Sequence, residues 1–151
     1  MPLSYTASIL GQLVLDVADV WDIPPGHMFR GRFPEDTGDY LPSAVITMQP
    51  VARSRVGTSV QEVHSFTIYG TFSVGEDTNP LALQIDRAKD LCDRIRPVAT
   101  TTDNLNYTRS PRYATHMMEP EIVSVDFPPI QPQDATCMVV LSFTGYTHSL
   151  E

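Results

Sequence analysis

The fold is decided by the stretch Val63-His64-Ser65-Phe66-Thr67-Ile68-Tyr69-Gly70-Thr71-Phe72-Ser73-Val74. Apolar side chains at every second position alternate with hydroxyl-bearing ones, which predicts a β-strand with one buried face and one wet face. Gly70 falls on the apolar side between Ile68 and Phe72. A missing side chain there indicates a bulge, a close approach by another element, or a plain bend.

A helix follows this strand, and the sequence contains signals for both of its ends. Asn79 can cap the first free amides, Pro80 suits the first helical position, and Pro97 ends the helix. The apolar stripe consists of Leu81, Ile85, Ala88, Leu91, Cys92 and Ile95. Charged residues occupy the opposite side, from Asp86 to Arg94, and we expect that side to be solvated surface.

A second helix is predicted near the start of the chain, ending before Pro24. Its apolar stripe consists of Ile9, Leu10, Leu13, Val14, Val17, Ala18 and Trp21, with Asp16, Asp19 and Asp22 off the stripe. We interpret the stripe as facing the core, with an exposed partner-binding face as the alternative.

Three further stretches are predicted to be strands: Ala44 to Met48, Glu121 to Phe127, and Thr136 to Gly145. The last is apolar on both faces near its start, which favours a central place in the sheet. The serial strand pairs predict an α+β fold with a mainly antiparallel four-stranded sheet and two helices packed on one face. Two long projecting loops complete the plan, and residues 1–151 are expected to form a single domain.

Motifs for catalysis or for cofactor and metal binding are absent from the sequence, so we predict no catalytic, cofactor-binding or metal-binding residue. No glycine-rich phosphate loop and no nucleophile elbow occur. The histidines are spread without ligand spacing, at His27, His64, His116 and His148. A hydrolase built from Asp36, Asp39 and His116 stays open as an alternative.

The two cysteines, Cys92 and Cys137, fall on the predicted apolar stripe and on the central strand. We therefore interpret them as small buried hydrophobic residues. A disulfide would require the helix to pack over that strand, and an expected cytoplasmic setting argues against one.

Charge restricts the possible partners. The formal net charge is −8, which opposes non-specific binding to DNA or to an anionic membrane. The sequence has no run of about 20 apolar residues that could span a bilayer and no secretory signal at its start, so we expect a soluble protein.

Two long irregular stretches, 24–42 and 98–120, are rich in aromatic, methionine and arginine residues, which is the composition of protein interfaces. Solvated loop charges are the alternative interpretation of the arginines. The candidate subunit or partner interface consists of Phe29, Arg30, Arg32, Phe33, Tyr40, Arg53, Arg55, Tyr107, Arg109, Arg112, Tyr113, Met117 and Met118.

The layout resembles that of the tail terminator, or tail completion, proteins of long-tailed bacteriophages. It has an N-terminal helix, a strand pair separated by a projecting loop (44–74), the helix 79–95 and a closing strand pair, in a small acidic chain. The long 98–120 segment departs from that layout.

The resemblance implies a virion protein, assembled in the host cytoplasm, that forms a homo-oligomeric ring, usually a hexamer, in the tail or neck. Such a ring caps the tail tube protein and joins the head-tail connector or stopper protein, while DNA passes through its lumen without sequence-specific binding. It implies no cofactor and no membrane. Another neck or head-tail adaptor protein, a small-ligand binding module and the hydrolase remain alternatives.

Overall fold

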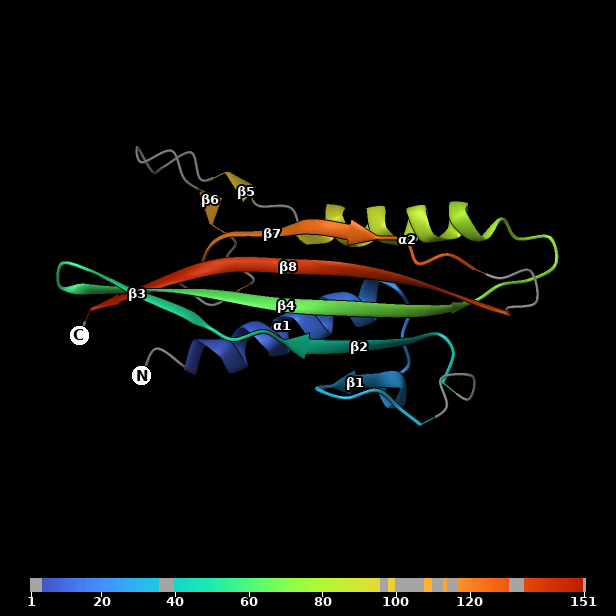
Figure 1. Ribbon diagram of the computed structural model, residues 1–151, viewed down its shortest axis with the longest axis horizontal. Helices are drawn as coiled ribbons and strands as arrows, with labels where there is room; N and C mark the ends of the chain where they lie inside the picture. Colours follow the sequence, from blue (N-terminus) through green and yellow to red (C-terminus); the bar gives the residue numbers. More distant parts are fainter. Residues whose placement is uncertain are drawn as a thin grey trace.

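The computed structural model describes residues 4–35, 40–95, 98–99, 108–109, 113, 117–130 and 135–150. It has the predicted α+β architecture (Figure 1). In chain order the elements are α1 (Ser4–Val20), the short 3₁₀ turn η1 (Pro25–His27), β1 (Met28–Arg30), β2 (Ser43–Met48), β3 (Ala52–Val56), β4 (Ser59–Ser73), α2 (Pro80–Ile95), β5 (Val98–Ala99), β6 (Thr108–Arg109), β7 (Met117–Asp126) and β8 (Thr136–Leu150).

The described strands form one sheet in the order β1-β2-β4-β8-β7-β6-β5, with β3 beside the first part of β4. β1 and β2 are parallel, and the other described pairs are antiparallel, as predicted. The four predicted strands correspond to β2, β4, β7 and β8, and β8 is central. The expectation of four strands is wrong, because the described sheet has eight. The added strands β1, β3, β5 and β6 are too short or too polar to show an apolar alternation.

β4 and β8 are the two longest strands of the described sheet and lie at its centre. They pair from Ser59↔Leu150 to Ser73↔Thr136. The sequence predicted β4 from Val63 onward, whereas it begins at Ser59. Glu62 and His64 occupy inward-facing positions in its first half. Because Glu62 interrupts the apolar alternation just before Val63, the pattern concealed the true start of the strand.

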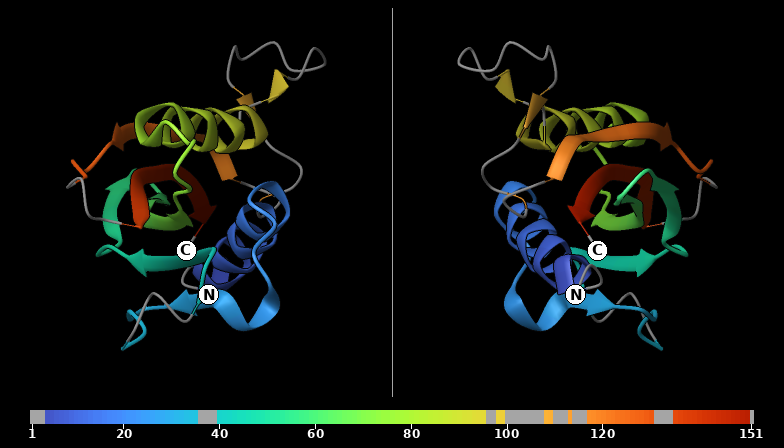
Figure 2. Two further views of the ribbon diagram at one scale, coloured as in Figure 1. Left: turned by 90° about the vertical axis from the view of Figure 1, so that its right-hand side faces the viewer. Right: turned by 90° about the vertical axis from the view of Figure 1, so that its left-hand side faces the viewer.

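Both helices pack against the same face of the curled sheet, as predicted (Figure 2). α1 contacts β2, α2 contacts β7 and β8, and the helices contact each other. The core holds Ile9, Leu13, Val17 and Trp21 from α1 and its end, Ala88, Leu91 and Ile95 from α2, and the paired positions Phe66/Phe143 and Ile68/Leu141 of β4 and β8. The α1 stripe therefore faces the core.

Gly70 marks a close approach by another element. A Cβ atom at this position would lie 2.6 Å from Cζ3 of Trp21, and the strand register is continuous there. Trp21 follows α1, and its Nε1–H donates a hydrogen bond to the Arg87 carbonyl oxygen at 2.9 Å. The glycine thus lets the indole lie between the sheet and both helices.

α2 has the predicted start, since the amide of Ala82 donates to Asn79 Oδ1 at 3.2 Å. Its buried face is rotated from the predicted stripe. Gln84 is buried, whereas Leu81 and Ile85 are 55% and 47% exposed. The buried amide of Gln84 donates to the carbonyl oxygens of Pro128 and Met138 at 3.0 and 2.7 Å, so a polar residue satisfied by backbone oxygens takes a core position.

β7 departs from simple alternation. A register shift occurs between Ile122 and Ser124, and it turns Val123 outward, where it is 54% exposed. Val125 still packs against the core. Simple alternation along the predicted strand Glu121 to Phe127 would place Val123 and Val125 on the same side, and the shift explains why they face differently.

Candidate functional site

Part of the predicted interface gathers around β1. The ring centroids of Phe29 and Tyr40 are 5.2 Å apart, and those of Phe33 and Tyr69 are 4.9 Å apart. The register places Phe29 level with Val45 and Val45 level with Tyr69, across β1, β2 and β4. We call the four rings the β1 aromatic patch. Arg30 and Arg32 are exposed in the same segment.

A second part lies on the β3 hairpin, defined here as residues 52–60. All five residues of β3 are exposed, and they include Arg53, Arg55 and Val56. Gly57, with φ 63°, is the first residue of the two-residue turn, a position that favours glycine. The hairpin projects at one end of the long axis of the molecule (Figure 1).

A buried polar cluster attaches the hairpin to the body. The Arg53 Nε lies 3.1 Å from Oε2 of Glu62, whose side chain is 1% exposed. Next along the inward face, His64 has Nε2 3.0 Å from Thr147 Oγ1 and Nδ1 3.3 Å from Thr6 Oγ1. Burial lowers the pKa of His64 from its ordinary 6.5, and the Glu62 charge opposes that shift. The cluster joins α1, β4 and β8.

The 98–120 segment contributes to the core instead of only projecting from it. Tyr113 and Met117 are 1% and 0% exposed. The Tyr113 hydroxyl donates to Asp16 Oδ2 at 2.6 Å. Their burial corrects the prediction that these two side chains are available to a partner.

For the remaining predicted interface residues in this segment, the structure describes only the backbone of two. The backbones of Arg109 and Met118 pair between β6 and β7. Tyr107 and Arg112 lie outside the described residues, as do the hydrolase candidates Asp36, Asp39 and His116.

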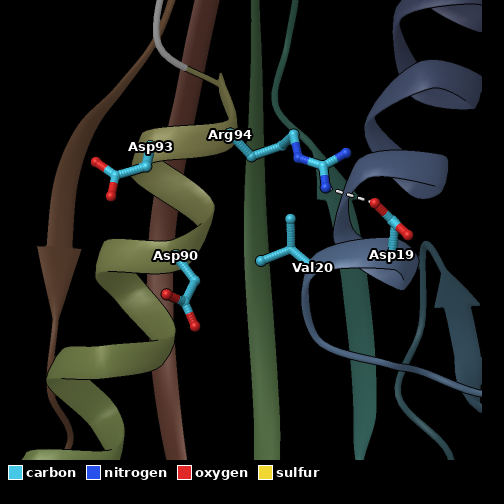
Figure 3. Close-up of a pocket in the computed structure, with 5 residues that line it drawn as sticks. All are labelled: Asp19, Val20, Asp90, Asp93 and Arg94. Atoms are coloured by element: carbon cyan, nitrogen blue, oxygen red, sulfur yellow. Dashed lines mark hydrogen bonds and ion pairs between the residues drawn. The ribbon is translucent and has the colours of Figure 1, made fainter.

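Asp16 was predicted to lie off the core stripe, but it is 2% exposed. It lies seven residues after Ile9, a spacing that returns to the same helix face, so the sequence contained the signal. Arg94 of α2 pairs with Asp19 and has Nη1 3.9 Å from Asp16 Oδ1. Figure 3 shows Arg94 extended across to α1, away from its own helix.

The shallow depression in Figure 3 is lined by Asp19, Val20, Asp90, Asp93 and Arg94. Its carboxylates have cationic neighbours: Asp90 lies 3.9 Å from Arg87, and Asp93 lies 3.4 Å from Lys89. Among the described residues, no group of three or more His, Cys, Asp and Glu could hold a metal ion. The depression is therefore a surface of paired charges.

A groove that the sequence analysis missed lies at the start of α2. We call it the α2 groove, and its lining consists of Asn79, Pro80, Leu81, Gln84, Phe127, Pro128, Pro129 and Ile130. Leu81 and Phe127 are 55% and 37% exposed. Gln84 binds the Pro128 carbonyl oxygen and so fixes one wall to the other.

The described side chains show no activated nucleophile. Burial raises the pKa of both free thiols, Cys92 and Cys137, so burial disfavours the reactive thiolate. None of the helices in the described segments is long and apolar enough to cross a membrane. Exposed aromatic, apolar and arginine side chains dominate the candidate surfaces, and these side chains are suited to binding another polypeptide.

Comparison with known proteins shows a likeness in fold. No family model matches the sequence, and no curated protein matches it. Among solved structures, the chain is similar to a chain of the virion of a native gene transfer agent (GTA) particle, with a TM-score of 0.53 and 15% sequence identity. The match covers 95% of this chain and 94% of the other. At this identity the match shows a shared fold.

Proposed function

We propose that this chain is a structural protein of a phage-like virion. The single observation that carries the proposal is the fold shared with a chain of a gene transfer agent virion over 95% of this chain. The candidate surfaces agree with such a role, because they present aromatic and arginine side chains without an activated nucleophile among the described residues.

Within the virion, the proposed role is that of the tail terminator. Subunits would associate head to tail into a ring, usually a hexamer, since unlike patches that meet through a closing rotation generate a ring. The ring would end the tail tube and bind the head-tail connector. The net charge of −8 is suited to a lumen that DNA crosses without adhering.

Negative-stain imaging of the purified protein, alone and mixed with tail tubes, tests this role. We expect closed rings in the first sample and rings seated at one end of the tubes in the second. Particles that stay monomeric and never bind tube ends would contradict the proposal. Rings that bind the connector and leave the tube ends bare would favour a neck or head-tail adaptor role.

A further inference from the structure

We propose that the β3 hairpin of one subunit docks into the α2 groove of the next subunit. The inference rests on the proposed ring and names the two surfaces that build it. In this contact, two of the predicted interface residues, Arg53 and Arg55, would bind at the α2 groove of the neighbouring subunit.

The shapes of the two surfaces are complementary. The hairpin is a narrow two-stranded ribbon that projects from the body, with Val56 60% exposed beside its turn. The α2 groove is a concave apolar surface, where Leu81 and Phe127 are 55% and 37% exposed. Docking would remove these apolar side chains from water, which drives protein association.

The charges of the two surfaces are complementary as well. Residues 52–60 contain two arginines and no acidic residue, and one of the two, Arg53, is paired with the buried Glu62. Residues 75–86, which include the start of α2, contain Glu76, Asp77 and Asp86 and no lysine or arginine. These three carboxylates are exposed. Glu76 and Asp77 lie three and two residues before Asn79 of the groove lining. An arginine-bearing hairpin would therefore meet an acidic rim at that end of the groove, which favours encounter and fixes orientation.

The positions of the surfaces require a head-to-tail contact. The β3 hairpin lies at one end of the long axis, and α2 begins at the opposite end (Figure 1). One subunit cannot fill its own groove with its own hairpin in this arrangement. Each subunit therefore presents one hairpin and one groove to two different neighbours. Such unlike, complementary surfaces on every subunit are what a closed ring needs.

Two substitutions separate the halves of the contact. Val56→Asp places a charge on the hairpin, and Leu81→Asp places one in the groove, both at exposed positions. Light scattering after size exclusion should show that each variant alone loses the ring and is monomeric. Mixed in equal amounts, they should form a one-to-one dimer that grows no further, because one intact hairpin meets one intact groove.

Leu15→Asp is the matched control, since Leu15 is 64% exposed on α1 and lies outside both surfaces. This variant should keep the wild-type ring mass, and circular dichroism should show that all three variants remain folded. If Val56→Asp unfolds the hairpin, exchanging the charges of the two surfaces gives a second test of the contact. Arg55→Glu should weaken self-association at least tenfold, and adding Asp77→Arg should restore most of it.

The outcomes distinguish this interface from the function on which it rests. Wild-type mass for both Val56→Asp and Leu81→Asp would overturn the interface and leave the ring standing. Two monomeric variants that fail to form a dimer would also overturn it, because hairpin and groove would then not be partners. A wild-type chain that stays monomeric, alone and with tail tubes, would overturn the interface and the tail terminator role together.

Discussion

At the scale of single residues, Gly70 controls how closely α1 can approach the sheet. An alanine methyl group would lie 2.6 Å from Trp21 Cζ3 and 2.9 Å from Phe72 Cε2, closer than van der Waals contact allows. We expect Gly70→Ala to lower the free energy of unfolding by about 1–3 kcal/mol, as overpacking of a filled core does. Urea unfolding monitored by tryptophan fluorescence measures it.

Gly11 provides the control for that substitution. It is exposed on α1 with no atom within 4 Å of an added Cβ, so Gly11→Ala should raise stability by about 0.5–1 kcal/mol through helix propensity. An equal gain in stability from Gly70→Ala would show that the Trp21 contact does not require a glycine in β4.

His64 gives the stability of the fold a pH dependence. Burial holds its folded pKa below 6.5, so below pH 6.5 the unfolded chain binds a proton that the folded chain resists. Stability should therefore be full above that pH and fall as the pH is lowered from 6.5 toward the folded pKa. The groups facing the ring are Glu62, Thr6 and Thr147, and Glu62 reduces the effect.

Guanidinium unfolding at pH 8.0, 7.0, 6.0 and 5.5 measures this dependence. His64→Gln should be less stable than the wild type at pH 8, because the threonine hydrogen bonds change, and it should show a flatter pH profile. An unchanged slope in His64→Gln would assign the dependence to another group.

At the scale of elements, the helix pair is tied together by a buried carboxylate. Asp16 of α1 accepts from the Tyr113 hydroxyl at 2.6 Å and has Arg94 of α2 3.9 Å away. Tyr113→Phe would remove a donor from this buried carboxylate and should cost about 1–3 kcal/mol. A double-mutant cycle with Asp16→Asn should show a coupling of about 1 kcal/mol or more between the two changes. Additive losses would mean that the two groups act independently.

The elements also show how far the sequence determined the fold. Both helices and the four long strands were predicted, because each carries an apolar period or a capping signal that depends only on local residues. Four of the buried polar residues were missed: Asp16, Glu62, His64 and Gln84. Asp16, His64 and Gln84 are hydrogen-bonded to Tyr113, Thr147 and Met138, which are distant in the sequence, and a local pattern cannot identify such partners. Glu62 is paired with Arg53 across the β3–β4 hairpin.

The candidate site was predicted in part for the same reason. Composition identified the arginines of the β3 hairpin and three rings of the β1 aromatic patch, Phe29, Phe33 and Tyr40, since aromatic and arginine residues outside the predicted elements can be found in the sequence. The α2 groove depends on Phe127 and Pro128 lying beside Leu81. That juxtaposition needs β7 to run beside α2, and only the tertiary structure shows it.

At the scale of the whole molecule, charge should make assembly sensitive to salt. The chain has a net charge of −8, so subunits repel one another in general, while the proposed contact brings Arg55 to an acidic rim. Both terms are screened within about 8 Å at physiological ionic strength. Repulsion between charges many ångströms apart is already largely screened at 50 mM salt, where the screening length is about 14 Å, whereas exposed ion pairs at the rim of the contact weaken as that length falls to about 4 Å at 500 mM. We therefore expect sodium chloride to weaken the ring, with the dissociation constant rising about tenfold between 50 and 500 mM, as measured by analytical ultracentrifugation.

The variant Arg55→Gln tests whether that salt dependence originates at the hairpin. It keeps a polar side chain of similar length and removes one positive charge from an exposed strand. Its ring should be weaker than the wild type at 50 mM salt and should change less as salt is added. Arg30→Gln removes the same charge from β1, outside the hairpin and the groove, and should keep the wild-type slope. Tighter wild-type rings at high salt would show that general repulsion outweighs the hairpin contact, and a slope flattened equally by both variants would place the attraction elsewhere on the surface.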